Sequence, residues 1–210
     1  SRYQGQVLHP QFWPEDLDYD GKKVIVIGSG ATAMTIVPSM TQKGAQVTMV
    51  QRSPTYVVSR PAEDKIANTL RKWLPEKWAY AITRRKNPTL SGYFYRQTRS
   101  QPAKTKAQLL GMATANLGEE MVKAHFTPSY NPWDQRMCLI PDGDLYKSIN
   151  EGSAQVVTGD IETWTESGLV MKDGTEVAAD IIVTATGINL TVMSGIAFDL
   201  DGTAISFPET

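Results

Sequence analysis

A continuous β-branched run that ends in a glycine-rich turn, KVIVIGSGATA at residues 23–33, constrains the fold of this chain most strongly. An apolar strand without polar alternation suits a position buried on both faces of a parallel sheet. Apolar residues at helical spacing follow the turn, and AQVTMV at 45–50 is typical of a second strand. Strand, turn, helix and strand form one βαβ unit, so we expect an α/β fold with a Rossmann-type parallel sheet. Pro38 should kink or shorten the helix.

The rest of the chain divides into two regions of different composition. Residues 61–125 show helical periodicity interrupted by prolines, and they are too long for a simple crossover, which predicts a helical insertion. Residues 154–187 are β-rich with turn signals at ESG and KDG, which predicts a β-meander before a last buried strand, DIIVTATG. We therefore expect residues 1–20 to form a hinge or linker and 21–210 to form one nucleotide-binding domain.

Composition excludes several classes of protein. Of the 210 residues, 41% are hydrophobic and 20% charged, and the formal net charge is −1, so the averages indicate no nucleic-acid or membrane partner. The single cysteine, Cys138, forms no CxxC pair, and we find no metal-ligand spacing. No apolar run approaches the roughly 20 residues that span a bilayer, and no signal-peptide layout is visible. We expect a soluble, cytoplasmic chain without a metal site.

The turn GSGATA has the GxGxxA arrangement of a phosphate-binding loop. The first glycine allows the tight turn, the second lets the backbone approach a pyrophosphate, and the small third residue lets the helix pack on the strand. The helix N-terminus adds unpaired N–H groups and a partial positive charge. A turn required only for packing is the alternative. The predicted cofactor contacts are Gly28, Ser29, Gly30, Ala31, Thr32 and Ala33.

The end of the second strand predicts which dinucleotide binds. An NAD site needs an acid there for the ribose 2′-hydroxyl, but no Asp or Glu occurs between Gly21 and Ala62. Arg52 and Ser53 occupy the place where a 2′-phosphate would lie. An arginine–phosphate hydrogen bond contributes about 1.5–3 kcal/mol, so NADPH is favoured over NADH. A solvated surface arginine is the other interpretation.

The opening string, Tyr3-x-Gly5-xxx-His9-xxx-Trp13-Pro14, resembles the fingerprint of the type I Baeyer–Villiger monooxygenases, with Tyr3 in place of their usual Phe. The related flavin-containing monooxygenases carry Phe or Tyr at the position of Trp13. Like that fingerprint, the string directly precedes the NADPH-binding strand.

Three further segments resemble this class B flavoprotein monooxygenase family in the same order: QRSPTYV at 51–57, YNPWDQR at 130–136 and VTATG at 183–187. By position in the last segment, Thr186 and Gly187 are expected beside the cofactor.

The resemblance also implies a catalytic residue. Arg136, by its position in WDQR, matches the active-site arginine that the NADPH domain directs towards the flavin. A guanidinium stays protonated near neutral pH, so it can stabilise the negative charge that develops during oxygen insertion. Gln135 stands where many relatives have Lys.

What the family does follows from the same resemblance. NADPH reduces FAD, the reduced flavin activates O2, and one oxygen atom enters a ketone or oxidises a soft nitrogen or sulfur atom. The GxGxxG motif that binds FAD in these enzymes does not occur in the 210 residues. The resemblance therefore implies that FAD is bound mainly by an upstream domain of the same parent chain. With a small-molecule substrate, that domain is the expected partner, and this chain is expected to be inactive alone.

Four alternatives stay open. An N-hydroxylating flavin monooxygenase fits the same motifs, whereas a flavin disulfide reductase is disfavoured because the chain has no cysteine pair. A nucleotide-sensing regulatory domain would carry an acid where Arg52 stands. A plain NADPH-dependent dehydrogenase would leave Trp13 and Pro14 unexplained.

Other conspicuous residues have simpler interpretations. His125 is expected to be structural, and the basic run at 84–86 to be a solvated face. Four large residues are expected in the core of the insertion: Trp73, Trp78, Met112 and Met121.

Overall fold

A computed structural model describes residues 3–190 and 196–205 of the chain. Its centre is a five-stranded sheet in which every neighbouring pair of strands is parallel. The strand order across this sheet is β1 (Gln6–Leu8), β10 (Ile181–Thr184), β2 (Lys23–Ile27), β3 (Gln46–Gln51) and β6 (Ala154–Thr158). The predicted α/β fold with a parallel sheet is confirmed.

The central strands are buried on both faces, as their unbroken apolar runs predict. Ile25 and Val26 of β2, and Ile182 and Val183 of β10, have no exposed surface. On one face, helix α1 (Ala31–Thr41) packs against the sheet together with α6 (Asp144–Asn150). Helix α1 continues past the buried Pro38 to its end at Thr41, so the proline does not terminate it.

An antiparallel three-stranded meander covers the opposite face. Leu169 and Met171 of the meander form a second buried cluster with Ile25 and Ile182 of the main sheet. The predicted meander is thus present, and the sheet lies between two layers. The meander strands are β7 (Ile161–Trp164), β8 (Gly168–Met171) and β9 (Glu176–Ala178).

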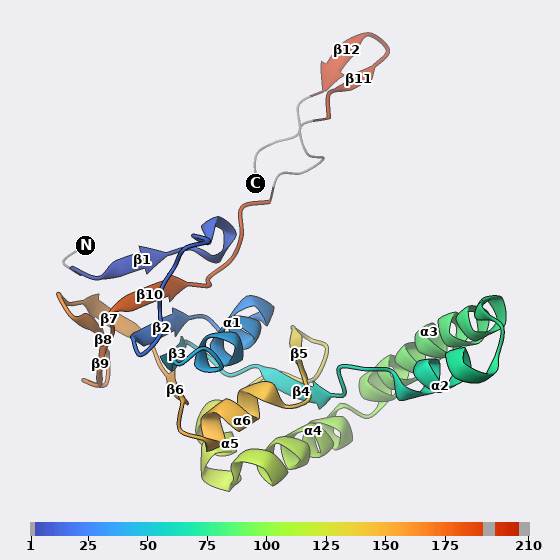
Figure 1. Cartoon of the computed structure of the whole chain (residues 1–210), viewed down its shortest axis with the longest axis horizontal. Coiled ribbons are helices and arrows are strands. Elements are labelled where there is room, and N and C mark those ends of the chain that lie inside the picture. The colour runs from blue at the N-terminus through green and yellow to red at the C-terminus, as the bar shows by residue number, and fades with distance from the viewer. Residues whose placement is uncertain (1–2, 191–195, 206–210) are drawn as a thin grey trace.

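Two strands outside the main sheet frame the helical insertion. Strands β4 (Tyr56–Arg60) and β5 (Met137–Pro141) pair in parallel, and the chain between them is mostly helical. Figure 1 shows α4 and α5 beside α6, whereas α2 and α3 form a hairpin that projects away from the sheet. The helices are α2 (Lys65–Trp73), α3 (Glu76–Ser100), α4 (Pro102–Leu117) and α5 (Glu119–His125).

Most of the large side chains expected in the core of the insertion are exposed in the structure. Trp73, Trp78 and Met112 are 82%, 66% and 51% exposed, so placing them in a core was wrong. The hairpin helices are in contact, and each buries a small residue, Ala67 in α2 and Ala79 in α3, whereas no further described layer covers their large side chains. Met121 does pack against the main core.

The remaining described elements are short. A 3₁₀ turn, η1 (Pro10–Phe12), follows β1, and an antiparallel hairpin joins β11 (Phe198–Leu200) to β12 (Thr203–Ile205). Among the residues with defined positions, no helix is long and apolar enough to cross a membrane. The same residues contain no cluster of three or more His, Cys, Asp or Glu side chains suited to a metal ion.

Candidate functional site

A pocket of about 560 Å³ opens where the central strands end. β2 lies between β10 and β3, and residues at and after the ends of these three strands form its walls together with Arg136. In open parallel sheets, ligands bind at the carboxyl ends of the strands, where successive connections leave in opposite directions. The lining residues are Ile27, Gly28, Ser29, Gly30, Thr32, Val50, Arg52, Ser53, Arg136, Ala185, Thr186, Gly187 and Ile188.

The two glycines of the turn are required for different reasons. Gly28 has a φ of +133°, and a Cβ there would collide with the carbonyl oxygen of Ala185. The fold itself therefore requires glycine at position 28. Gly30, at the N-cap of α1, has an ordinary φ of −84°, and a Cβ there would meet no atom within 4 Å. The protein's own packing does not explain Gly30, which instead keeps an open space at a helix N-terminus.

The other residues of the turn divide between the pocket and the core. Thr32 and Ser29 line the pocket, whereas Ala33, which was also expected as a cofactor contact, does not line it and is fully buried, as its packing role predicts. Ala31 is exposed in the first turn of α1 and does not line the pocket. The helix N-terminus directs its unpaired N–H groups towards the end of β2, where an anion would be stabilised.

Arg52 and Ser53 follow β3 and form the adjacent wall. Both are exposed, and no described carboxylate forms a salt bridge with Arg52. The guanidinium is thus available to an anionic group in the pocket.

The end of β3 is fixed by a buried network. The side-chain amide of Gln51 donates from Nε2 to the His125 carbonyl at 2.7 Å and to Thr158 Oγ1 at 2.9 Å. His125 Nδ1 and the same Thr158 oxygen lie 2.8 Å apart, and burial lowers the pKa of the His125 imidazole. His125 therefore has structural contacts outside the pocket, and the network holds the residue directly before Arg52.

Arg136 reaches the glycine turn from the opposite side. Its Nη2 donates to Ser29 Oγ at 3.1 Å, and Ser29 Oγ in turn donates to the Ser53 carbonyl at 3.4 Å. Cys138, two residues later, donates from Sγ to the Ser29 carbonyl at 3.6 Å. Ser29 is thus the point at which three parts of the pocket wall meet.

The backbone of Arg136 is held by hydroxyl groups from two of the segments singled out in the sequence. Tyr130 OH donates to the Arg136 carbonyl at 3.1 Å and lies 2.8 Å from Thr55 Oγ1. Tyr56 OH donates to the Tyr130 carbonyl at 2.6 Å, and the two rings meet edge to face with centroids 5.4 Å apart. Burial raises the pKa of Tyr56 to about 12. QRSPTYV and YNPWDQR are therefore in direct contact.

The same loop is attached to the helical hairpin. Arg99 Nη1 lies 2.6 Å from Asp134 Oδ1, and its hydrogen bond lowers the pKa of that carboxyl. The rings of Tyr95 and Trp133 pack edge to face at 5.6 Å. The hairpin and the loop that carries Arg136 thus share one contact region.

The fingerprint residues lie beside the pocket rather than in it. Gly5 precedes β1, and His9 caps the 3₁₀ turn by accepting from Gln11 N at 3.2 Å. Trp13 packs edge to face on Tyr19 and against the main core. Pro14 follows it, half-buried. None of these four fingerprint residues lines the pocket.

Hydrogen bonds between side chains and backbone nevertheless tie the fingerprint segment to the pocket wall. Gln11 Oε1 accepts from Asn189 N at 2.8 Å, and its Nε2 donates to Asn189 O at 3.2 Å. Thr184 Oγ1 donates to the Leu8 carbonyl at 3.0 Å. The loop containing Thr186 and Gly187 is therefore held on one side by β2 and on the other by the first segment of the chain.

Sequence reasoning missed four residues that line the pocket: Ile27, Val50, Ala185 and Ile188. Ile27 precedes the glycine turn, and Val50 occupies the corresponding place near the end of β3, so strand position was a usable signal for both. The contact between Ala185 and Gly28 depends on the pairing of β10 with β2 and had no signal in the sequence.

Comparison with known proteins shows one family. Residues 1–193 match the family described as flavin-binding monooxygenase-like. MymA of Mycobacterium tuberculosis is 48% identical over 212 residues, and the FAD-containing monooxygenase EthA of the same species is 47% identical over 210. Each alignment covers 99% of this chain but 43% of the relative. The chain thus spans less than half the length of these relatives.

A solved structure shares the fold. The complex of OTEMO with FAD and NADP superposes with a TM-score of 0.66 at 17% identity, covering 89% of this chain and 43% of that protein.

Proposed function

Since this chain belongs to the flavin-binding monooxygenase-like family, we propose that it forms the NADPH-binding portion of an FAD-dependent monooxygenase. The observation that carries the proposal is the open space at Gly30. A glycine that no neighbouring atom requires, at a helix N-terminus in a pocket of about 560 Å³, suits the close approach of a pyrophosphate.

The pocket residues suggest a division of labour for NADPH. Gly28, Gly30 and Thr32, with the N-terminus of α1, hold the pyrophosphate. Arg52 and Ser53 receive the 2′-phosphate, because a guanidinium and a hydroxyl both donate to phosphate oxygens and no acid is present to prefer a ribose hydroxyl. Thr186 and Gly187 close the other wall. Bound NADPH supplies a hydride, and the chain orients it.

We assign Arg136 the catalytic role. It lines the same pocket, and its permanent charge can stabilise the anionic character that develops as oxygen is transferred. The fingerprint residues Gly5, His9 and Trp13 act at a distance, by holding the segment that is tied to the loop around Asn189.

FAD is assigned mainly to the remainder of a longer parent protein, in line with a chain that spans 43% of its relatives' length. The whole enzyme would transfer one oxygen atom from O2 to a ketone, or oxidise a soft nitrogen or sulfur atom. We place residues 1–20 as a hinge and 21–210, with its insertion at 61–125, as the NADPH domain of a cytoplasmic enzyme.

Flavin reduction by the full-length protein tests the proposal. Mixed anaerobically with NADPH, the protein should lose its flavin absorbance much faster than with NADH. After O2 is admitted with a cyclic ketone or an alkyl sulfide, a product heavier by one oxygen atom should form. A protein that binds NADPH without bleaching a flavin would instead be the regulatory domain, and one that prefers NADH would contradict the proposal.

A further inference from the structure

Gln51, the last residue of β3, is a polar side chain buried behind the nucleotide pocket. It is 1% exposed. Met49 packs in the main core, whereas Val50 packs in the cluster beneath the meander. Because side chains alternate between the two faces of a strand, Gln51 shares the face of Met49. Its neighbours Val50 and Arg52 line the pocket, and Gln51 does not. The amide is therefore placed to hold the strand end and not to touch a ligand.

Both N–H groups of the Gln51 amide have acceptors. Nε2 donates to the His125 carbonyl at 2.7 Å and to Thr158 Oγ1 at 2.9 Å. A carbonyl oxygen can only accept, so the NH2 group and not Oε1 must face His125. His125 is the last residue of α5, where the terminal carbonyl groups have no partner within the helix. Gln51 thus satisfies one of the carbonyl groups at the end of α5.

The oxygen of the same amide is left without a hydrogen bond. Within residues 3–190 and 196–205, Gln51 Oε1 is the one buried side-chain nitrogen or oxygen atom that has no partner. A buried acceptor without a partner lowers stability. An apolar side chain of similar length would avoid that cost, so what the glutamine provides is its two donated hydrogen bonds.

The backbone at Gln51 is fixed as well. Gln51 and Thr158 are partners in the register of β3 and β6, and Gly159 N donates to the Gln51 carbonyl at 2.9 Å. Directly after this pair the chain leaves the sheet. The direction in which Arg52 leaves the strand is therefore set by how Gln51 is held.

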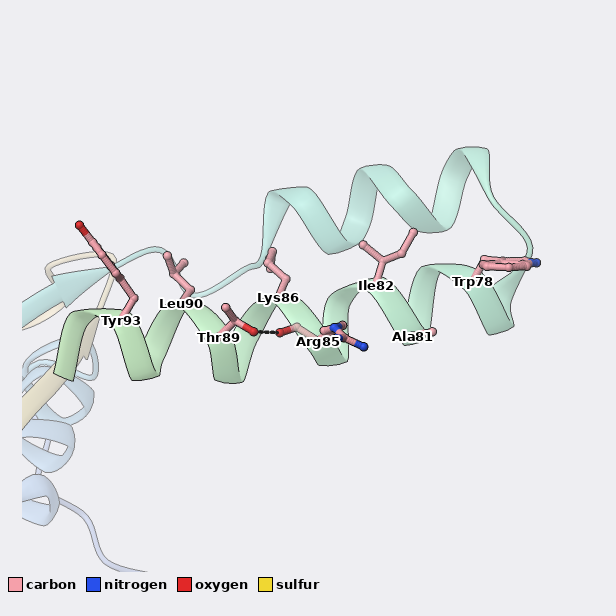
Figure 2. A pocket seen from close by; sticks show the side chains of 8 residues that line it. All are labelled: Trp78, Ala81, Ile82, Arg85, Lys86, Thr89, Leu90 and Tyr93. Atoms are coloured by element: carbon pink, nitrogen blue, oxygen red, sulfur yellow. Dashed lines mark hydrogen bonds between the residues drawn. The ribbon is translucent and has the colours of Figure 1, made fainter. Parts of the chain in front are cut away.

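The helical insertion reaches this point through its last helix. His125 contributes its carbonyl to Gln51, and its ring Nδ1 lies 2.8 Å from Thr158 Oγ1, so backbone and side chain both join the network. The α2–α3 hairpin is separate from it. The hollow of about 780 Å³ on α3 is lined by that helix alone (Figure 2). The carboxyl end of α5 is thus where the insertion holds the end of β3.

These contacts give Gln51 a role in the choice of dinucleotide. We propose that Gln51, supported by Thr158 and the carboxyl end of α5, is the positioning residue that holds Arg52 for NADPH, an inference that rests on the proposed contact of Arg52 with the 2′-phosphate. No described salt bridge holds the guanidinium, so its placement depends on the backbone from which it extends. NADH has no 2′-phosphate, so a displaced Arg52 affects NADPH alone.

Dinucleotide affinity of the full-length protein tests the inference. The readout is the ratio of the Kd for NADH to the Kd for NADPH, measured by calorimetry, because a general loss of stability would weaken both dinucleotides alike. Gln51→Met, which has a similar length, should lower this ratio by about three- to tenfold, a part of the roughly ten- to a hundredfold that Arg52 supplies. The Kd for NADH should change by less than about twofold.

Two further variants separate positioning from folding. Thr158→Val keeps a β-branched residue in β6 and removes one of the two acceptors, so it should fold and lower the ratio less than Gln51→Met does. Ser148→Ala is the matched control. It removes a buried hydroxyl that lies 2.8 Å from Thr41 Oγ1, at the end of α1 away from the glycine turn. This variant should leave the ratio unchanged.

A double variant measures whether Gln51 acts through Arg52. In the Arg52→Ala protein, Gln51→Met should change the Kd for NADPH by less than about twofold, because no guanidinium is left to displace. A larger change there would contradict the positioning role.

The outcomes distinguish this inference from the proposed function. A ratio that Gln51→Met leaves intact, an equal loss of affinity for both dinucleotides, or an equally lowered ratio in Ser148→Ala would overturn the inference and leave NADPH binding in place. A protein that does not prefer NADPH, or that keeps its preference in Arg52→Ala, would overturn the Arg52 assignment and the inference with it.

Discussion

The guanidinium of Arg136 donates from Nη2 to the Oγ of Ser29 at 3.1 Å, joining residues 107 positions apart. Ser29 belongs to the glycine turn, and Arg136 lies directly before β5. Because Ser29 also donates to the Ser53 carbonyl, one hydroxyl links the turn, the end of β3 and the loop of Arg136. The proposed nucleotide and catalytic residues therefore form one connected wall.

Arg136→Lys should lower kcat for oxygenation by about 10²–10³-fold, the range found when one group that stabilises developing charge is removed. Lysine keeps the charge but loses the planar fork. NADPH should still reduce the flavin, so O2 consumption without product measures the loss. Ser29→Ala, which frees the guanidinium without removing it, should cost less than tenfold. Equal losses in the two variants would assign Arg136 a structural role.

Gly30→Asp should abolish NADPH binding without destabilising the fold. A Cβ at Gly30 meets nothing within 4 Å, and Asp is a favoured N-cap residue, so the melting temperature should hold or rise. The carboxylate would occupy the proposed phosphate position and raise the Kd by about a hundredfold or more, measured by calorimetry.

Gly30→Asn separates charge from size in the same position. It has a similar shape and also caps helices well, so it should weaken binding less than Asp does. Unchanged affinity in both variants would mean that the turn serves only packing.

Arg52→Ala should remove the preference for NADPH. Loss of an arginine–phosphate contact costs about 1.5–3 kcal/mol, which corresponds to roughly ten- to a hundredfold in the Kd for NADPH. The Kd for NADH should stay within twofold, because NADH has no 2′-phosphate. The preference of Arg52→Lys for NADPH over NADH should lie between that of the unchanged protein and that of Arg52→Ala. If Arg52→Ala still prefers NADPH, another residue must bind the 2′-phosphate.

Tyr56→Phe should destabilise the loop that carries Arg136 by about 0.5–1.5 kcal/mol at neutral pH, the usual net contribution of one hydrogen bond. Tyr95→Phe, at a ring that is 49% exposed, is the matched control and should change the free energy of unfolding little. Denaturant unfolding at pH 8 measures both.

The raised pKa of Tyr56 also leads us to expect a loss of stability at alkaline pH. Its folded-state pKa is raised to about 12 from an unfolded value near 10, so its contribution is complete below pH 10 and declines as the pH rises towards 12. Burial raises the pKa of Tyr146 to about 12 as well. Tyr56→Phe should therefore remove part of the alkaline loss and leave the part that belongs to Tyr146. If the dependence of stability on alkaline pH were unchanged in Tyr56→Phe, the raised pKa of Tyr56 would not be its cause.

Local patterns predicted the elements that depend on local chemistry. The apolar run at 23–28 became β2 with its turn, and ESG and KDG became turns of the meander. These signals work because burial on both faces and tight turns restrict residue type at fixed spacing.

Features that depend on distant pairing were not predictable in the same way. Strands β4 and β5 are short and partly exposed, and each forms a strand by pairing with the other. The exposure of Trp73 and Trp78 could not be predicted. A helix with large apolar side chains at periodic positions has the same sequence pattern whether or not another helix or sheet packs over it. The hydrogen bond between Arg136 and Ser29 likewise exists only once the strands are assembled.

The pairing of β1 with β10 has a consequence for synthesis on the ribosome. The Thr184 hydroxyl meets the Leu8 carbonyl across 176 positions, so β1 waits without its neighbour until β10 has been translated. The pocket wall formed by residues 185–188 emerges directly after β10. A nascent chain can thus complete the glycine turn and its helix early, yet it becomes able to hold a dinucleotide only after residues 185–188 have emerged.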